Sequence, residues 1–152
     1  MIEINNLTKF AVDKKSFAQV AKKVLSGENR ETETLSLAFV SKEEIAKLNK
    51  KFRKKNKATD VLAFGENPKI QSPNPKSNYL GEIVICPDVV KENVPPQRDP
   101  AKGGTKKFKA DFDREMMKVF VHGILHLCGY DHEKTKRMAE VMEEKQNLYL
   151  PR

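Results

Sequence analysis

Two hydrophobic periodicities alternate along the first half of the chain. Residues 2–5 and 34–40 alternate apolar with polar side chains, which predicts two short strands because successive strand side chains point to opposite faces. After the first strand, apolar residues recur at helical spacing as far as Gly27, and after the second, Ser41 and Glu44 form a capping pattern that opens another helix. Strand and helix therefore follow one another twice.

The middle of the chain combines two apolar runs with long polar segments. Residues 61–64 and 80–86 predict two further strands in a hairpin-like pair, and the stretch between them, rich in proline, asparagine and serine, predicts a long loop. Residues 94–113 contain prolines, glycines and several lysines, so we expect a mobile basic segment there.

Helical patterns dominate the last third. Between about residues 113 and 128, apolar side chains cover nearly every face of a helix, which predicts that this helix is buried. The tail places Met138, Met142 and Leu148 at helical spacing and predicts a closing amphipathic helix. The order of elements predicts an α+β fold, in which a small mixed four-stranded sheet packs with helices around a buried central helix.

Size and composition indicate one globular unit, and we expect residues 1–152 to form a single domain. The formal net charge of +8 favours a polyanionic partner, nucleic acid first, although a surface rich in both lysine and glutamate is also common in heat-adapted proteins. Cys86 and Cys128 are predicted to be reduced packing residues, which favours the cytosol. Without a leader-like start or a long apolar run, we expect a soluble, unexported protein with no membrane partner.

All three histidines fall within the segment VHGILHLCGYDHE. His122 and His126 are four residues apart, so on a helix both lie on one face, as two ligands of one metal ion require. Gly129 allows a left-handed turn that brings His132 toward the same ion. A single histidine here would more often be a hydrogen-bonded core residue or a helix-end cation, but three would each need a separate polar partner if no ion bound them. The cluster therefore predicts metal-binding histidines on the central helix.

The predicted ligand set suits a catalytic zinc ion. Three neutral imidazoles leave one tetrahedral position for water, unlike a closed structural site. Cys128 lies roughly 200° around the helix from His126 and is excluded as a ligand. The spacing resembles the metzincin pattern HExxHxxGxxH, but Gly123 stands where those peptidases carry the glutamate that deprotonates water. Peptide hydrolysis is therefore the less favoured chemistry.

At the same residues the chain resembles the YbeY family of metal-dependent endoribonucleases, whose hallmark is HGxLHLxGYDH. Residues 122–132, HGILHLCGYDH, match this motif throughout. Residues 48–65, LNKKFRKKNKATDVLAFG, are similar to the family's Asn, Arg and Thr-Asp-Val-Leu block, and LGEIVIC is similar to its LGDIVIC strand. Ala63, Gly65 and Glu82 depart from the family's usual serine, proline and aspartate, and none of them is a predicted ligand. The likeness spans most of the chain.

The resemblance implies one zinc ion per chain, held by the three histidines, and a cleft arginine that corresponds to Arg53. It also implies endoribonuclease activity on ribosomal RNA in the bacterial cytoplasm, with roles in maturation of the small-subunit rRNA 3′ end and in ribosome quality control. The implied partners are RNA, particularly rRNA, and the small ribosomal subunit. The oligomeric state stays open.

Phosphodiester cleavage needs stabilisation of charge on the phosphoryl oxygens and a nucleophile, either water or the RNA 2′-hydroxyl. Zinc provides Lewis acidity and lowers the pKa of bound water, and Arg53 would grip the phosphate with two nitrogens. An arginine within KKFRKKNK would otherwise be expected on a solvated loop. The lysines of this stretch are predicted to bind RNA backbone without reading bases, namely Lys50, Lys51, Lys54, Lys55 and Lys57.

Other polar residues near these motifs have two interpretations each. Asp131 either holds the second ring nitrogen of a ligand histidine or caps the following helix. Thr59 and Asp60 either orient the arginine or close a turn, and we favour the structural role. Tyr130 is expected to pack rather than to stack a base. With 7% aromatic residues and no tryptophan, the sequence shows no evident stacking platform, so specificity is expected from RNA shape or from the ribosome.

Three functions compete for this sequence. The leading hypothesis is a zinc-dependent single-strand endoribonuclease acting on rRNA. The second is a non-catalytic, zinc-containing rRNA-binding ribosome assembly factor, and the third is a metallopeptidase that recruits its base from outside the motif. The basic stretch favours the first two, because a peptidase has no general need of it.

Overall fold

The computed structural model describes residues 2–65, 78–95, 104–130 and 135–151, with only the backbone for residues 104–106. The elements follow in the order β1 (Ile2–Asn6), α1 (Lys14–Gly27), β2 (Thr34–Phe39), α2 (Lys42–Arg53), β3 (Val61–Gly65), β4 (Tyr79–Ile85), α3 (Pro87–Asn93), α4 (Gly104–Leu127) and α5 (Lys136–Tyr149). The four strands and five helices of the described residues form an α+β fold, which confirms the predicted class.

The strands form one mixed sheet in the order β1-β2-β4-β3, so β1 and β3 are its edges. β1, β2 and β4 run parallel, and β3 runs antiparallel to β4. The hairpin-like pair is confirmed, while most of the predicted loop between its strands lies outside the described residues. In β4, Gly81 has a φ of +152°, and a Cβ there would lie 2.4 Å from the carbonyl oxygen of Phe64. Only glycine allows the two strands to approach so closely.

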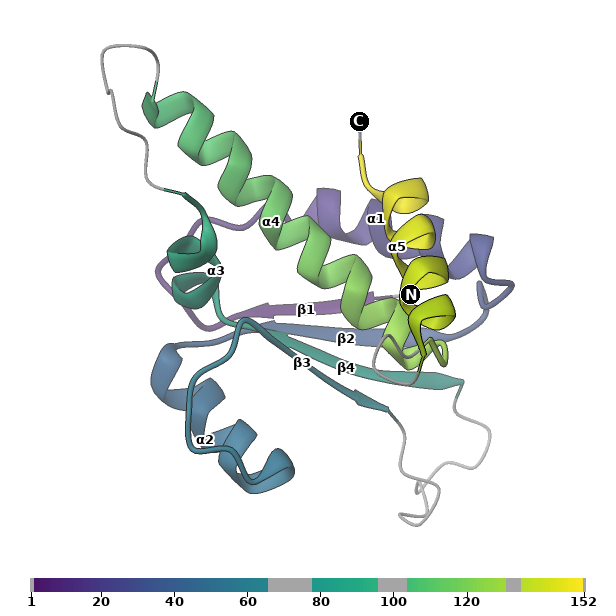
Figure 1. Ribbon diagram of the computed structural model, residues 1–152, viewed down its shortest axis with the longest axis horizontal. Helices are drawn as coiled ribbons and strands as arrows, with labels where there is room; N and C mark the ends of the chain where they lie inside the picture. The colour runs from purple at the N-terminus through teal and green to yellow at the C-terminus, as the bar shows by residue number, and fades with distance from the viewer. Residues whose placement is uncertain (1, 66–77, 96–103, 131–134, 152) are drawn as a thin grey trace.

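The helices divide between the two faces of the sheet (Figure 1). α1, α4 and α5 lie on one face, and α2 lies on the other. The alternation along β4 matches this division, because Ile83 and Ile85 belong to the core beneath α4, whereas Val84 belongs to the smaller core beneath α2. The sheet therefore separates the histidine helix from the helix that ends at Arg53.

α4 begins earlier than the sequence predicts. Because it starts at Gly104, the prediction of a mobile segment is wrong for residues 104–113, and residues 96–103 lie outside the described part. Phe112 stacks against Phe10 with ring centroids 5.7 Å apart, while Lys107 and Lys109 are exposed. The basic run is thus the solvated face of a packed helix. The side chains that α4 buries in the core are Met116, Met117, Phe120, Val121, Ile124 and Leu125.

Two other helices differ in detail from the sequence prediction. The seven residues of α3 are too few to show helical periodicity, so this helix is absent from the prediction. α5 is present, but Leu148 is 61% exposed, so its predicted packing is wrong. The buried stripe of α5 passes through Met142, Gln146 and Tyr149, at spacings of four and three residues, and Leu148 lies off it.

The described ranges bear on the expectations for membrane-spanning helices and for the two cysteines. No helix in them is long and apolar enough to cross a bilayer. Cys86 is buried and Cys128 half-buried, and both are free thiols. Burial raises the pKa of Cys128 to about 11, so this thiol is protonated at neutral pH.

Candidate functional site

His122 and His126 lie one turn apart near the C-terminal end of α4. Their ring centroids are 5.0 Å apart and the ring planes are inclined by 76°. Both side chains are half-buried, and the spacing of four residues puts them on one face of the helix. The structure therefore brings two of the three predicted ligands together.

The separation of these two rings fits two ligands of one metal ion. Zinc binds imidazole nitrogens at about 2.0–2.1 Å with tetrahedral angles, which puts the centroids of two ligand rings roughly 5 Å apart. The observed separation of 5.0 Å agrees with that value. His122 and His126 are thus the described residues that could hold a zinc ion.

The remaining predicted members of the site, His132 and Asp131, lie outside the described residues. Across the ranges that the structure describes, no three His, Cys, Asp or Glu side chains are grouped to hold a metal. The third ligand therefore stays a prediction. α5 begins at Lys136 with Thr135 as its N-cap, whose side chain accepts a hydrogen bond from the Met138 amide at 3.1 Å. Thr135 is thus the N-cap of α5, and the role of Asp131 stays a prediction.

Gln146 is a functional candidate that the sequence reasoning missed. Its Oε1 lies 2.5 Å from Nδ1 of His122, across the interface between α5 and α4. An amide oxygen only accepts hydrogen bonds, so Nδ1 must carry the proton, which puts the lone pair of the ring on Nε2. A metal-binding histidine commonly donates its other N–H in this way. The signal in the sequence that could have identified Gln146 is its helical spacing from Met142 and Tyr149, which puts a polar residue in the buried stripe of α5.

A cavity of about 240 Å³ lies beside His122, between α4 and α5. Its lining includes Lys118, Gln146 and Glu143, together with Met142. Lys118 is one turn before His122 and exposed, so it adds a positive charge to the same face of the helix. The lining beside His122 therefore carries one ammonium group, from Lys118, and one carboxylate, from Glu143.

The turn after α4 has the geometry that its glycine predicts. Gly129 has a φ of +104°, its amide donates to the carbonyl of His126 at 3.0 Å, and the amide of Tyr130 donates to the carbonyl of Leu125 at 3.1 Å. This pair of bonds is a Schellman motif, with glycine in the left-handed position. The predicted reversal of the chain after His126 is therefore present.

Glu28, the C-cap residue of α1, forms hydrogen bonds both to the turn after α4 and to the end of α5. Its carboxylate accepts hydrogen bonds from the hydroxyls of Tyr130 at 3.0 Å and Tyr149 at 2.8 Å, and Lys145 lies at 3.4 Å. Burial by itself would raise the pKa of Glu28, but the two hydroxyls and the ammonium group outweigh it and lower that pKa. Tyr130 also packs against the main core, which agrees with its predicted packing role.

Gly123, the residue at the position of the metzincin glutamate, faces the sheet. A Cβ at this position would lie 3.2 Å from two side-chain carbons of Ile83 in β4. Ile83 is fully buried, so it has little room to move away. Position 123 therefore serves the close packing of α4 on β4 and does not point toward a substrate.

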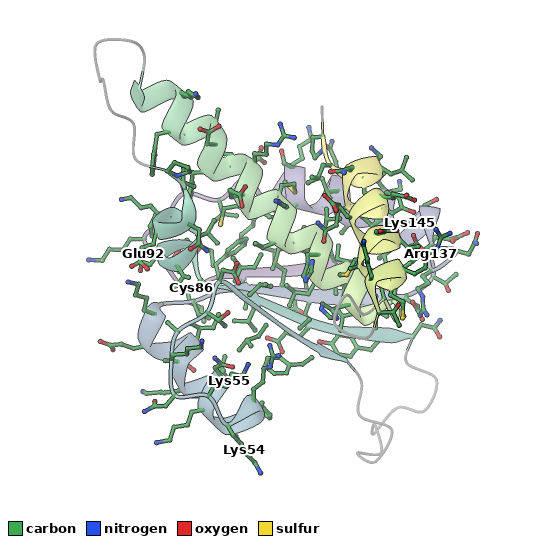
Figure 2. All side chains as sticks on the ribbon, viewed as in Figure 1. Lys54, Lys55, Cys86, Glu92, Arg137 and Lys145 are labelled. Atoms are coloured by element: carbon green, nitrogen blue, oxygen red, sulfur yellow. The ribbon has the colours of Figure 1, made fainter. Side chains whose placement is uncertain are left out.

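Arg53 and the predicted RNA-binding lysines gather at the other side of the sheet. Arg53 is the last residue of α2, and the side chains of Lys50, Lys51, Lys54, Lys55 and Lys57 are all exposed. Figure 2 shows Lys54 and Lys55 at the end of α2, across the sheet from α4. As the last residue of α2, Arg53 belongs to the helix on the other face of the sheet from α4, which carries the two described histidines. An RNA strand that touches both sites must pass an edge of the sheet.

The segment that follows Arg53 is held in place by three hydrogen bonds. Asn49 is buried, and its Nδ2 donates to the carbonyl of Lys57 at 2.9 Å. The hydroxyl of Thr59 donates to Oδ1 of Asp60 at 3.4 Å, and the carbonyl of Asp60 accepts from the amide of Cys86 at 2.9 Å. These contacts close the turn into β3, in agreement with the structural role favoured for Thr59 and Asp60.

Residues 3–152 match the family model described as Endoribonuclease YbeY. The chain belongs to the YbeY family. Its relatives include the Endoribonuclease YbeY of Thermotoga neapolitana, which is 38% identical over 115 residues, a match that covers 76% of this chain and 64% of the relative. The chain thus covers less than two thirds of that relative's length. The Endoribonuclease YbeY of Aliarcobacter butzleri is 34% identical over 95% of this chain and 88% of its own.

A solved structure supports the YbeY fold. The solution structure of a protein from Thermotoga maritima matches 98% of this chain and 86% of its own, with a TM-score of 0.63 and 31% sequence identity. The mixed four-stranded sheet with its helices is therefore an arrangement that an experimentally determined protein shares.

Proposed function

We propose that this chain is a zinc-dependent endoribonuclease that cleaves single-stranded RNA in the bacterial cytoplasm. Its proposed role is maturation of the 3′ end of small-subunit rRNA and ribosome quality control, with the small ribosomal subunit as partner. The observation that carries the proposal is the YbeY match over residues 3–152, because relatives in this family are named endoribonucleases.

Two features of the chain support RNA as the substrate. The net charge is +8, and the end of α2 and the residues after it carry six exposed basic side chains between Lys50 and Lys57. Cations in such a run bind phosphates by releasing counterions, which gives affinity for nucleic acid without base recognition. A peptidase has no comparable need of this surface.

The histidine site supports a metal-assisted mechanism. A zinc ion held by His122, His126 and His132 would supply Lewis acidity toward the phosphoryl oxygens of RNA. Gln146 holds the proton of His122 on Nδ1, which orients the ring and presents Nε2 for ligation. Lys118, on the same face of α4, is available to attract the phosphate.

The proposed role of Arg53 is to grip a phosphate with its planar guanidinium group. α2 lies across the sheet from α4. We therefore propose that Arg53 holds a phosphate of the RNA some distance from the nucleotide that lies at the histidines. A guanidinium fork binds two phosphate oxygens at once, so lysine at this position would keep the charge and lose the geometry. Arg53→Lys therefore separates the contribution of the positive charge from that of the two-pronged guanidinium geometry.

The metallopeptidase alternative gains no support from position 123. A Cβ there would press on Ile83, so the general base of a peptidase would have to come from outside the histidine motif. The alternative of a non-catalytic assembly factor makes a different prediction, which is RNA binding without turnover.

The test is cleavage of a single-stranded RNA that spans an rRNA 3′ end. Zinc-loaded protein, His126→Ala, Arg53→Ala and Arg53→Lys would be purified identically, with zinc content measured for each. We expect cutting by the unmutated protein, none by His126→Ala, and a large loss for both Arg53 variants. Exposed Lys22→Ala, in α1, is the matched control for loss of a surface cation and should cut normally.

Equal cutting by all variants would identify the activity as a contaminant and favour the assembly-factor function. Loss of cutting in His126→Ala without loss of zinc would contradict the assigned ligand.

A further inference from the structure

Phe52 is an exposed aromatic side chain inside the basic run at the end of α2. It is 56% exposed and is flanked by Lys51 and Arg53. The apolar stripe of α2 passes through Ile45 and Leu48, which pack against the smaller core, and Phe52 continues the stripe beyond the covered part of the sheet. A solvated charged surface has no need of such a ring, because exposing it to water costs free energy.

A second aromatic ring fixes the position of Phe52. The ring of Phe64 in β3 lies with its centroid 5.0 Å from that of Phe52, at an interplanar angle of 57°. Nζ of Lys51 lies 5.2 Å from the centroid of Phe52. The Phe52 ring therefore contacts a neighbouring ring, and the ammonium group of Lys51 lies over it.

Such a combination of an exposed ring and surrounding lysines fits single-stranded nucleic acid. Single-strand binding sites pair a cationic track for the backbone with aromatic rings on which unpaired bases stack. We propose that Phe52, supported by Phe64, stacks an unpaired base of single-stranded RNA, while the surrounding lysines bind the backbone. This inference rests on the proposed function and names a contact that its substrate makes.

The position of Phe64 links this contact to the histidine helix. Phe64 lies in the edge strand β3, directly before Gly65. A Cβ at Gly65 would lie 3.8 Å from Cδ2 of Leu127, the residue that follows His126. The β3 edge of the sheet therefore carries the Phe52–Phe64 pair on its α2 face, and on its opposite face it lies against the C-terminal end of α4. An RNA strand stacked on Phe52 lies at the edge that leads to the histidines.

Tryptophan fluorescence gives a direct test, because the chain contains no tryptophan. Phe52→Trp would be titrated with a single-stranded RNA oligonucleotide, and binding would be followed independently by the anisotropy of a dye on the RNA. Leu7→Trp is the matched control, since Leu7 is 73% exposed and follows β1 at the opposite edge of the sheet. We expect RNA to quench the tryptophan at position 52 and not the one at position 7.

Affinity measurements with His126→Ala as the common background separate stacking from cleavage. Phe52→Leu should weaken binding about tenfold, Phe52→Tyr should bind normally, and neither should change the salt dependence. On an oligonucleotide with abasic residues, Phe52→Leu should bind as tightly as the background protein. The loss would then depend on the presence of bases.

Several outcomes would overturn the inference. Normal affinity of Phe52→Leu, or an equal loss on normal and abasic RNA, would exclude stacking while leaving RNA binding intact. Absence of quenching in Phe52→Trp with RNA bound would do the same. If neither the unmutated protein nor the His126→Ala background bound RNA, the proposed function and this contact would fail together, which is a distinct result.

Discussion

Gln146 on α5 and His122 on α4 form a contact of 2.5 Å between Oε1 and Nδ1. The two residues are 24 positions apart in the sequence, and the contact depends on α5 packing along the C-terminal half of α4. Gln146 is buried, so its amide has little alternative to this partner. The closing helix therefore takes part in orienting the first predicted metal ligand.

Replacement of Gln146 by methionine should weaken zinc binding by about 10- to 100-fold. Methionine has a similar length but offers no good acceptor, so the Nδ1–H of His122 loses its partner and the ring loses its fixed orientation. Zinc affinity would be measured by competition with a chromophoric chelator. Gln146→Glu keeps an acceptor and should retain most of the affinity.

Exposed Asn147→Ala is the matched control on the same turn of α5. If Gln146→Met bound zinc as tightly as the unmutated protein, the contact would serve packing alone.

The hydrogen bonds to Glu28 predict an acid-dependent loss of stability. A glutamate whose pKa is lowered by folding stabilises the native state above its ordinary pKa of 4.5, and this contribution is lost as the pH falls through the lower folded value. Glu28→Gln should lower the free energy of unfolding by about 2 kcal/mol at pH 7, because bonds to a charged acceptor are lost. The difference between the two proteins should shrink below pH 4.5. Denaturant unfolding at several pH values measures both effects.

The side chain of Glu28 is 11% exposed, whereas Glu31 nearby is exposed. Glu31→Gln should therefore leave the pH profile unchanged. A constant difference between Glu28→Gln and the unmutated protein from pH 7 to pH 3 would contradict the assigned cause.

Local patterns predicted the elements of this fold because their signals lie within a few residues. Alternation predicted β1 and β2, apolar runs predicted β3 and β4, and the positive φ of Gly129 follows from a glycine placed just after a helix. The spacing of His122 and His126 likewise predicts that their rings meet, because it depends only on the helical period.

Contacts between distant segments were beyond the sequence. Nothing local to Gln146 or Glu28 indicates that one meets His122 or that the other meets two tyrosines more than a hundred residues away. The strand order β1-β2-β4-β3 likewise depends on contacts between segments that are distant in the sequence. The position of α2, which ends at Arg53, across the sheet from α4 also required the structure.

The close approach of α4 to β4 predicts that Gly123 tolerates no side chain. Alanine would gain about 1 kcal/mol of helix propensity, but its Cβ would press on Ile83, and overpacking of this kind costs about 1–3 kcal/mol. We expect Gly123→Ala to be destabilising and Gly123→Glu much more so, since the latter also buries a charge. Equilibrium unfolding in denaturant measures each change.

The clash has a specific partner, which allows a double-mutant test. Ile83→Ala removes all three carbons that approach position 123, so Gly123→Ala should cost less in that background than alone. Additive effects would show that the two positions do not touch.

The basic run at the end of α2 predicts a salt-dependent affinity that individual lysines control. Each phosphate contact on a single strand contributes about 0.7 to the slope of log affinity against log salt, so Lys55→Ala should weaken RNA binding and reduce that slope by about this amount. Lys22→Ala removes the same charge from α1, an exposed position on the other side of the sheet, and should change the slope little. Titrations with single-stranded RNA at four or more salt concentrations measure both variants. If Lys22→Ala lowered the slope as much as Lys55→Ala, net charge would account for binding. The end of α2 would then have no special part in holding RNA, and the strand would have no fixed path from Arg53 around the β3 edge to the histidines.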